Sequence, residues 1–565
     1  MKKVTEGVKV VTSVGNQSKY RHWLDELVDD IIAYWGQGAT RINCSCGLSV
    51  SGLQHVGRLR GEVTLANTVM HQLRNQGFET RHTIVRYTSD EWKGKEAQLA
   101  QFPDPKAARA YVGRRLADVP DPKGELPSWI NRYWLDFGGY LDHFSRDAEP
   151  LSTHEIYSWP QMHELVRYTI QNREAARQII NKYRERNPYP PDWIPVDVVC
   201  EKCKRLSTTT VVSTDLDAYT AQYRCEGCGA EGSTNIENGK LSWRIEWAAL
   251  WKVLNVGFEP FGKDHATPGG SRDSAKEIAE TFFKFKPPVP FAYEWVGLSE
   301  DNVDKGDMGS SDFNGFTPKT WISVASGEVL RYLYLKNRPM KRIVLGLDNV
   351  PTYIGQYDRA ERVYYRIDTP RAPVQEVSDI RRSYELAHLD PVLAEAPIQI
   401  PFLHAVILAQ IIPQEEFSDV AIAKLTESAM IPASLTNAER VYIVTRLNQA
   451  YTWVTQYAPP SSRITILAQP PTNLNQDVPS NLRVLFQQLH NSLNPNQWTE
   501  QAITAAMKPL TKSLPKKDQH LFFRFLYQAF LGQDQGPRAS AFLAFTEPQL
   551  VLRRLQYLAG NSNKR

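Results

Sequence analysis

Long apolar runs are missing from this 565-residue sequence. A helix that crosses a membrane needs about 20 consecutive apolar residues. The densest apolar run, residues 402–412, is shorter and predicts a buried helix instead. The first residues, MKKVTEGVKVVTSVGNQ, contain neither a continuous apolar core nor a small-residue cleavage pattern, so they lack the features of a signal peptide. We therefore expect no membrane span and a cytoplasmic location.

Cysteine content and net charge are also low. Six cysteines in a chain of this length do not form the disulfide framework of a small secreted fold. The basic residues behind the formal net charge of +4 are spread along the chain, so charge permits a polyanionic partner without requiring one. A hydrophobic content of 42% and a charged content of 23% exclude wholesale disorder. At about 150 residues per domain, the length predicts roughly three or four domains.

Strand and helix patterns alternate in the first part of the chain. Residues 42–48 have the period of a strand, and Cys44 and Cys46 lie on its apolar face, where we interpret them as core residues. Residues 51–77 place apolar side chains at helical spacing, and residues 80–88 predict a second strand. A strand, a helix and a strand in this order predict a parallel sheet.

The middle of the chain interrupts this alternation. Residues 95–235 contain Pro-rich loops, a long stretch at 154–185 that is predicted to be helical, and four of the cysteines. The strand pattern resumes at residues 241–251, and after GFEPFGKDHATPGGS a helix is expected with Ser271 as its cap. We interpret the interruption as an insertion into the sheet domain.

Helix signals dominate from about residue 361 onward. Thr436 and Glu439 have the spacing of a capping box, and LFFRFLYQAFLG is another helical stripe. Residues 458–479 are rich in Pro, Gln and Asn and predict a loop or linker. This part of the chain is therefore expected to be all-helical.

The four cysteines of the insertion form two Cys-x-x-Cys pairs. Cys200 pairs with Cys203 and Cys225 pairs with Cys228, which is the spacing of a four-thiolate zinc knuckle. Four thiolates leave zinc no open coordination position, so the predicted site is structural. Unliganded thiols are the alternative.

The tetrapeptide HVGR, residues 55–58, lies between the first strand and the following helix. Free backbone N–H groups and the positive end of the helix dipole would suit a triphosphate there. The alternative is a tight turn with an exposed histidine. Taken alone, the tetrapeptide does not decide between the two interpretations.

The surrounding segment, SGLQHVGRLRG, resembles the HIGH signature of class I aminoacyl-tRNA synthetases, particularly the lysyl enzymes of that class with their SGxxHIGNLRE segment. Further blocks resemble the same family in the same order: GKLSWRIEWAALW, FEPFGKDHATPGGSRDSAKEIA, PPVPFAYEW, EVLRYLYLKNRP and FLGQDQGPR. The resemblance covers residues 35–550, with 95–190 and 370–500 matched only loosely.

The resemblance implies an α/β Rossmann-like class I synthetase catalytic domain with a zinc-knuckle insertion, followed by an all-α anticodon-binding domain. The expected division is 1–94 and 241–300 for the two halves of the catalytic domain, 95–240 for the insertion, 301–360 for a KMSKS-like loop and connecting domain, and 361–565 for the anticodon-binding domain.

The same resemblance implies an ATP-dependent ligase that activates lysine to lysyl-adenylate and transfers the lysyl group to tRNA(Lys). The implied metals are Mg²⁺ and a structural Zn²⁺. Neither DNA nor a membrane is expected as a partner. It implies catalytic roles for His55, Gly57, Ser310 and Ser311, and ATP contacts for His55, Gly57, Asp264 and His265. Implied lysine contacts are Gly47, Ser49, Trp243, His265 and Tyr293. The alternatives are that Asp264 and His265 cap a turn and that the two aromatics are core or rim residues. The chemistry needs no covalent nucleophile, because positioning and charge stabilisation supply most of what adenylate formation requires.

Asp307 and Asp312 depart from the family at its second signature. Lysyl enzymes of this class carry KMSSSKGN, and the matching stretch here is DMGSSD, with aspartate at both lysine positions. A carboxylate near phosphate is repulsive by about several tenths to a few kcal/mol, depending on exposure. Lys305, two residues upstream, and Arg58, at the fourth position of the HIGH signature, are cations that could compensate.

A second zinc site, made in some family members by an Asp, a Cys and two His, also differs in residue type. Asp121 matches, but Glu125, Leu126 and Arg132 take the other places.

Three functions follow from the sequence: an active lysine–tRNA ligase, a catalytically weakened paralogue that binds tRNA or amino acid, and a synthetase for another amino acid, with glutamate the nearest.

Overall fold

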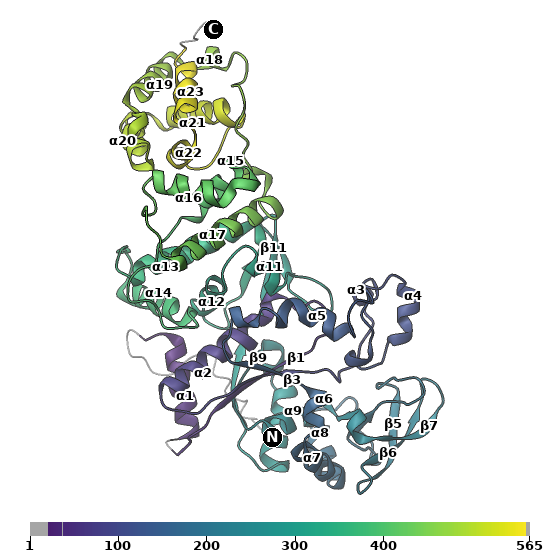
Figure 1. Ribbon diagram of the computed structural model, residues 1–565. Helices are drawn as coiled ribbons and strands as arrows, with labels where there is room; N and C mark the ends of the chain where they lie inside the picture. The colour runs from purple at the N-terminus through teal and green to yellow at the C-terminus, as the bar shows by residue number, and fades with distance from the viewer. Residues whose placement is uncertain (1–20, 37, 561–565) are drawn as a thin grey trace.

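A five-stranded parallel sheet lies at the centre of the computed structural model, which describes residues 21–36 and 38–560 (Figure 1). The strand order is β10-β9-β1-β2-β3, and every neighbouring pair is parallel. The predicted strand–helix–strand unit and its parallel sheet are therefore confirmed. The strands are β1 Asn43–Leu48, β2 His82–Arg86, β3 Ala148–Ser152, β9 Val256–Gly262 and β10 Val289–Tyr293.

Helices cover both faces of this sheet. Helices α1 (Trp23–Trp35) and α2 (Ala66–Asn75) share a buried cluster with Cys44, Cys46 and Phe258. The next residue along β9, Glu259, points to the opposite face, where it accepts hydrogen bonds from indoles of α9 (Trp243–Val253). The interpretation of Cys44 and Cys46 as core residues is confirmed, because both are buried.

Two predictions about element type or boundaries were wrong. Residues 241–251 are not a strand: β8 ends at Leu241 and α9 begins at Trp243. This apolar run is buried nearly all round, and short apolar runs of that kind fit a strand or a buried helix equally well. Residues 154–185 form three helices, because Pro160 lacks an N–H and starts a new one. These helices are α6 Thr153–Tyr157, α7 Pro160–Gln171 and α8 Arg173–Asn181.

Ser271 does not cap the helix that follows GKDHATPGG. Gly270 occupies the N-cap position, and Ser271 is the first residue of α10 (Ser271–Glu277). Its hydroxyl lies 2.9 Å from Nδ1 of His265 instead. Ser271 therefore orients a histidine of the loop that precedes the helix.

The segment expected as the insertion contains short helices and two small antiparallel sheets, but its strand β3 belongs to the central sheet. The helices are α3 Glu96–Leu99, α4 Pro105–Ala108 and α5 Trp129–Gly138, together with α6 to α8. The sheets pair β4 Val196–Val198 with β8 Gly239–Leu241, and join β5 Thr209–Asp215, β6 Thr220–Cys225 and β7 Glu231–Asn235. A buried aromatic cluster that includes Trp92 and Trp129 is packed against Phe313, so the insertion contacts the loop after β12.

A smaller sheet follows β10 and leads to the helical region. Its order is β12-β11-β13, formed by Val303–Asp307, Val296–Glu300 and Ile343–Leu345, and helices α11 (Pro318–Ile322) and α12 (Gly327–Leu335) precede β13. The helices that follow are α13 Val350–Tyr364, α14 Val374–Ala387, α15 Phe402–Ile411, α16 Phe417–Glu427, α17 Asn437–Gln456, α18 Leu474–Asp477, α19 Ser480–Ser492, α20 Glu500–Lys512, α21 Lys516–Leu531, α22 Ala539–Phe545 and α23 Pro548–Leu558.

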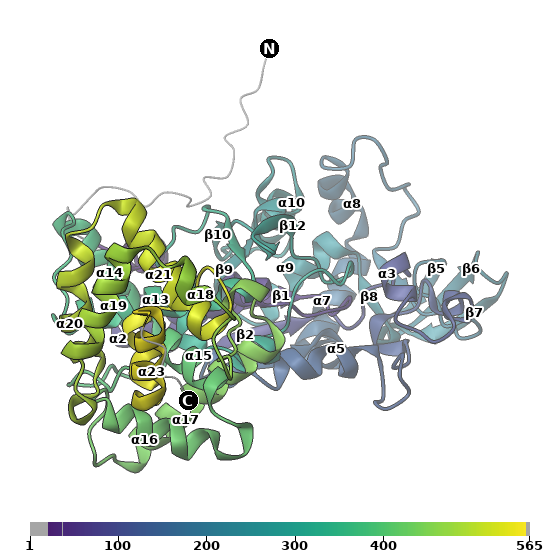
Figure 2. The same ribbon diagram turned by 90° about the horizontal axis from the view of Figure 1, so that it is seen from above.

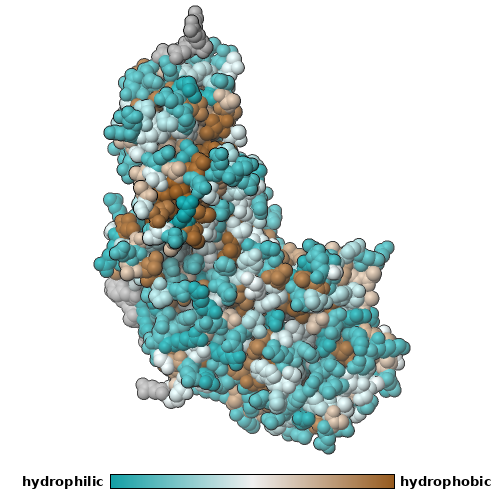
Figure 3. Space-filling model, viewed as in Figure 1, coloured by the Kyte–Doolittle hydropathy of each residue, from teal (hydrophilic) through white to brown (hydrophobic). Residues whose placement is uncertain are grey.

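These helices form a column on one side of the sheet domain, and β5 to β7 lie at the opposite end (Figures 1 and 2). The predicted capping box is present at the start of α17, where Thr436 and Glu439 bond each other's backbone N–H groups. The predicted all-helical region is confirmed. Its visible face carries larger apolar areas than the mainly hydrophilic sheet domain (Figure 3). Within residues 21–36 and 38–560, no helix is both long and apolar enough to cross a membrane.

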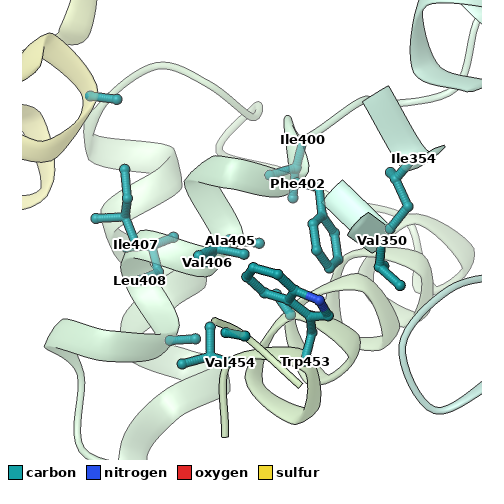
Figure 4. Packing of buried hydrophobic residues seen from close by; sticks show 14 of the residues in the cluster. Val350, Ile354, Ile400, Phe402, Ala405, Val406, Ile407, Leu408, Trp453 and Val454 are labelled. Carbon is teal, nitrogen blue, oxygen red and sulfur yellow. The ribbon is translucent and has the colours of Figure 1, made fainter. Parts of the chain in front are cut away.

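Trp453 of α17 lies at the centre of the packing between α13, α15 and α17 (Figure 4). It is fully buried, its ring centroid is 6.3 Å from that of Phe402, and its indole N–H donates to the carbonyl of Leu347 at 2.7 Å. The same buried cluster includes Val56 of the sheet domain and Leu558 of α23. One continuous core therefore joins the column to the sheet domain.

Replacing Trp453 with alanine should lower the free energy of unfolding of the helical region by about 3–5 kcal/mol, because the deletion leaves a cavity in this core. Thermal and urea unfolding followed by circular dichroism measure the effect. Leu403→Ala is the matched control, since Leu403 is on α15 but exposed. Equal effects of the two substitutions would show that Trp453 is not central to the packing.

Candidate active site and metal centre

A cavity of about 450 Å³ opens at the carboxyl ends of three parallel strands. Gly47 near the end of β1, Gly262 at the end of β9 and Tyr293 at the end of β10 all line it. Ligands of open α/β sheets bind at this edge, where side chains and backbone groups of several strands converge. The cavity is therefore the candidate active site.

Most of the site residues expected from the sequence meet in this cavity. Its lining includes Gly47, His55, Gly57, Trp243, Asp264, His265, Tyr293 and Ser310. Ser49 and Ser311 lie outside the lining. The structure thus brings eight of the ten together, and their individual roles stay predictions.

His55 is held at the start of the helix that follows β1. It occupies the N-cap position of a short 3-10 turn, Val56–Leu59, and is 7% exposed, so the alternative of an exposed histidine is wrong. Burial, and to a lesser extent Arg58, lowers the pKa of His55 to about 3, so the imidazole is neutral at physiological pH. Its Nδ1 has no hydrogen-bond partner among the described residues. The ring is therefore free to bond a ligand.

The space beside the His55 ring is too small for a side chain at position 57, where the sequence has glycine. A Cβ at position 57 would lie 2.8 Å from His55 Nδ1, which is closer than real side chains pack, and 3.3 Å from Cβ of Val296, which is a tight contact. Position 47 is restricted in the same way, because a Cβ added to Gly47 would lie 2.4 Å from Cε2 of Tyr87. Both glycines let other groups approach the backbone closely.

One wall of the cavity is aromatic. Trp243 and Trp247 stack with ring centroids 5.3 Å apart, and Tyr87 meets Trp243 edge-on at 5.2 Å. Beneath them, the buried Glu259 accepts hydrogen bonds from Trp247 Nε1 and Trp251 Nε1, both at 2.9 Å. These rings are fixed in place and can cover an aliphatic chain.

His265 and Asp264 lie at the rim, on the turn after β9. Nδ1 of His265 is 2.9 Å from the Ser271 hydroxyl, and its Nε2 is 3.6 Å from Asp264 Oδ2. Burial lowers the pKa of His265, and the Asp264 carboxylate opposes that shift. Asp264 itself is exposed, so this rim combines an oriented neutral imidazole with an accessible carboxylate.

The two aspartates that replace the signature lysines are each bonded to a cation from elsewhere in the chain. Asp307 Oδ1 accepts from Arg342 Nε at 2.9 Å, and Asp312 accepts from Lys95 Nζ at 3.0 Å. Ser310 between them is buried, and its Oγ accepts from Arg58 Nε at 3.2 Å. Arg342 also donates to Asp304, from Nη2 at 3.1 Å, so the excess negative charge expected from the sequence is compensated in part.

Sequence reasoning missed several residues of the cavity and its border. Glu62, Tyr87 and Glu259 line it, and Arg342 and Lys95 neutralise the loop. Glu259 lies inside the quoted FEPFGKDH block, so a buried carboxylate could have been noticed there. The pairing of Lys95 with Asp312 joins residues far apart in the sequence and carried no local signal.

The four insertion cysteines come together as predicted. The Cys200–Cys228 and Cys203–Cys225 sulfur pairs are 3.7 and 3.6 Å apart, and all four Sγ atoms lie within 4.8 Å of one another. Tetrahedral zinc with Zn–S bonds of about 2.3 Å places its sulfurs roughly 3.8 Å apart. The cluster therefore has the dimensions of a four-thiolate metal site.

Asp121 binds a guanidinium where the sequence suggested the remnant of a second metal site. Arg132 donates to both carboxylate oxygens at 2.8 Å, and the backbone N–H groups of Glu125 and Leu126 donate at 2.9 and 2.8 Å. These bonds, led by that of Arg132, hold the pKa of Asp121 well below its usual range. The carboxylate is thus fully occupied by protein donors.

Comparison with known proteins agrees with this geometry. The family model described as class I (K) tRNA synthetases matches residues 21–390. A lysine–tRNA ligase of Aeropyrum pernix is 38% identical over 96% of this chain and 99% of its own length, and one of Thermococcus kodakarensis is 31% identical over 95% and 99%. A solved glutamate tRNA ligase of Elizabethkingia meningosepticum covers 93% of this chain and all of its own at 11% identity and a TM-score of 0.33, which is too low to carry an argument. The family match and the full-length relatives agree: the chain belongs to the class I (K) tRNA synthetases.

Proposed function

We propose that this protein is a lysine–tRNA ligase, which activates lysine with ATP to lysyl-adenylate and transfers the lysyl group to tRNA(Lys). The observation that carries the proposal is the cavity, which combines a neutral histidine at a helix start with an aromatic wall and buried carboxylates. The full-length likeness to lysine–tRNA ligases supports it. A cytoplasmic location stays a prediction.

The helix start is the proposed triphosphate site. The backbone N–H of Val56 already donates to the carbonyl of Phe316, and that of Arg58 to the carbonyl of His55. The neutral His55 ring would hydrogen-bond a phosphate oxygen, and the positive end of the helix dipole favours the charge of the phosphates. The lysine carboxylate then attacks the α-phosphorus, the bond to pyrophosphate breaks, and positioned donors stabilise the charge that develops. Asp264, an exposed carboxylate on the cavity rim, fits a Mg²⁺ that enters with ATP.

The charge of the cavity favours lysine over glutamate as the amino acid. Glu62 and Glu259 are both buried in its lining. Arg272 pairs with Glu259. A glutamate side chain would therefore place its carboxylate near that of Glu62 in this low-dielectric space, whereas a lysine side chain brings the opposite charge. The aromatic wall suits the aliphatic part of lysine as well.

The compensated loop favours an active enzyme over a weakened paralogue. Lys95 pairs with Asp312, Arg342 pairs with Asp307 and with Asp304, and Arg58 lines the cavity next to Ser310. The loop is also fixed in position, since Met308 N–H donates to the carbonyl of Val296 at 2.9 Å and Phe313 packs on Trp129. An ion pair carries no net charge, so we infer that Arg58, which lines the cavity, supplies positive charge in place of the missing lysines.

The helical column is the proposed binding region for the anticodon stem-loop of tRNA(Lys). This assignment rests on family resemblance and on the position of the column, which extends away from the central sheet (Figure 1). Unpaired anticodon bases are recognised by stacking and edge contacts. Charging assays with anticodon variants of the tRNA test the assignment.

Lysine-dependent exchange of pyrophosphate into ATP should be present, and His55→Ala should reduce it by about 10²–10³, the usual cost of losing one positioned donor to a transferring group. His520→Ala is the control, because His520 is an exposed residue of α21. If wild-type protein exchanges with glutamate but not with lysine, or with no amino acid at all, the proposed function is wrong.

The cysteine cluster should hold one structural zinc, and its sulfur spacing supports this. Elemental analysis of protein purified without chelator is expected to find one zinc per chain, lost in Cys225→Ser and kept in the core control Cys46→Ala. Substoichiometric zinc in the wild type, with all four thiols free to titrate, would contradict the assignment.

A further inference from the structure

A second cavity is enclosed by helices α12, α13, α14 and α17, which lie where the helical column meets the sheet domain (Figure 1). Its volume is about 360 Å³. No residue that lines it also lines the active-site cavity. Cavities that bind small ligands measure about 300–1,000 Å³, so this one has room for a small planar group. It is therefore a candidate ligand site separate from the active site.

Tyrosine rings form much of the wall of this cavity. The four that line it are Tyr357, Tyr365, Tyr384 and Tyr442. The ring centroids of Tyr357 and Tyr384 are 5.3 Å apart, and the Tyr384 hydroxyl donates to Glu361 Oε2 at 2.9 Å. The Tyr365 hydroxyl donates to the carbonyl of Leu393 at 2.8 Å. These bonds hold the rings in place, and such aromatic faces are surfaces on which a nucleobase stacks.

The carboxylates of the wall differ in their partners. Glu361 accepts from Tyr384, and Asp390 pairs with Arg146. Glu328, which is partly buried on α12, makes no hydrogen bond or ion pair with any residue that the structure describes. Its oxygens are available to a ligand, and the amino groups of guanine, adenine and cytosine are suitable donors, whereas uracil has no amino group.

A hollow with two arginines adjoins this cavity, since Tyr365 and Leu393 line both. Arg366 and Arg381 line the hollow, and within residues 21–36 and 38–560 neither forms an ion pair. Arg381 donates only from Nε, to the carbonyl of Val363 at 3.0 Å. None of the residues that line the hollow is acidic. Two guanidinium groups without acidic partners favour a phosphate, which arginine binds through its paired N–H donors.

A nucleotide has the parts that this arrangement would bind, because its base is planar and its phosphate is anionic. We propose that the tyrosine-lined cavity and the adjoining hollow form a second nucleotide-binding site, in which the tyrosines and Glu328 hold an amino-bearing base and the two arginines bind its phosphate. Free nucleoside monophosphates and an unpaired nucleotide of an RNA present the same base and phosphate. Separate experiments distinguish these two sources.

Calorimetric titration of the full chain with guanosine monophosphate tests for a free nucleotide. The active site is also expected to bind nucleotides, so the number bound per chain is compared between wild type and variants. Replacing both Arg366 and Arg381 with alanine should remove one bound nucleotide per chain, and Tyr365→Leu should do the same. Uridine monophosphate should bind this site about tenfold more weakly than guanosine monophosphate, and Glu328→Gln should abolish that difference.

Fluorescence anisotropy with labelled tRNA tests for an RNA nucleotide. Replacing both arginines should weaken tRNA binding about tenfold and lower the slope of log affinity against log salt concentration by about 1. Tyr365→Leu removes a stacking surface but no charge, so it should weaken binding about tenfold and keep the slope. Arg371→Ala is the matched control, because Arg371 is an exposed arginine that lines neither the cavity nor the hollow.

The inference is upheld if binding of either probe depends on both the arginines and Tyr365. Dependence of guanosine monophosphate identifies a free nucleotide as the ligand, and dependence of tRNA identifies an RNA nucleotide. The inference is overturned if neither probe depends on them, or if only the arginines or only the ring matters, because a nucleotide site needs both contacts. Tyr442→Leu removes another ring of the wall and replaces Tyr365→Leu if that variant does not fold. Neither titration requires lysine activation, so failure of the proposed function would not affect this inference.

Discussion

The guanidinium of Arg60 holds together the parts on which the active site depends. It is buried in the turn after β1 and donates to the carbonyls of Glu294 at 2.7 Å, Lys341 at 2.8 Å and Arg338 at 3.2 Å. Burial lowers the pKa of Arg60 to about 10, so it stays charged at neutral pH. A buried cation needs these acceptors, and they fix two segments to the same turn: the residue after β10 and the loop between α12 and β13. The helix start, the end of β10 and the approach to β13 therefore keep one geometry.

Polar side chains around this turn differ in charge and in hydrogen-bond partners because their surroundings differ. His55 is neutral because burial removes its charge, while Glu259 keeps a charge partner in Arg272. Glu62, on the same turn as Arg60, is 3.9 Å from Arg58 Nη1 through Oε1, and its Oε2 has no hydrogen-bond partner among residues 21–36 and 38–560. A site arranged in this way does not reorganise when charge develops, and such preorganisation is the main source of rate enhancement in many enzymes.

The sequence predicted the parts of the fold whose signals are local. The strand–helix–strand opening, the capping box at Thr436 and the cysteine cluster depend on spacing within short segments, and all three are present. Residues 241–251 were misassigned because an apolar run buried nearly all round has no distinguishing period. The π-turn at Arg60–Leu65 was not predicted, because the apolar pattern of an ordinary helix continues across it. The cations that face Asp307 and Asp312 depend on tertiary pairing, which spacing does not encode.

The pairing of Asp121 with Arg132 has a consequence for how the insertion acquires its shape. The turn at Asp121 is closed by the side chain of Arg132 instead of by an ion from solution. This side chain is part of the protein and is present as soon as the chain is synthesised. That segment can then mature without regard to the metal content of the cell, whereas the four-cysteine cluster further along cannot if it needs an ion. The two parts of the insertion would thus differ in whether their folding needs a metal ion. Metal depletion would affect the four-cysteine cluster and leave the turn at Asp121 intact.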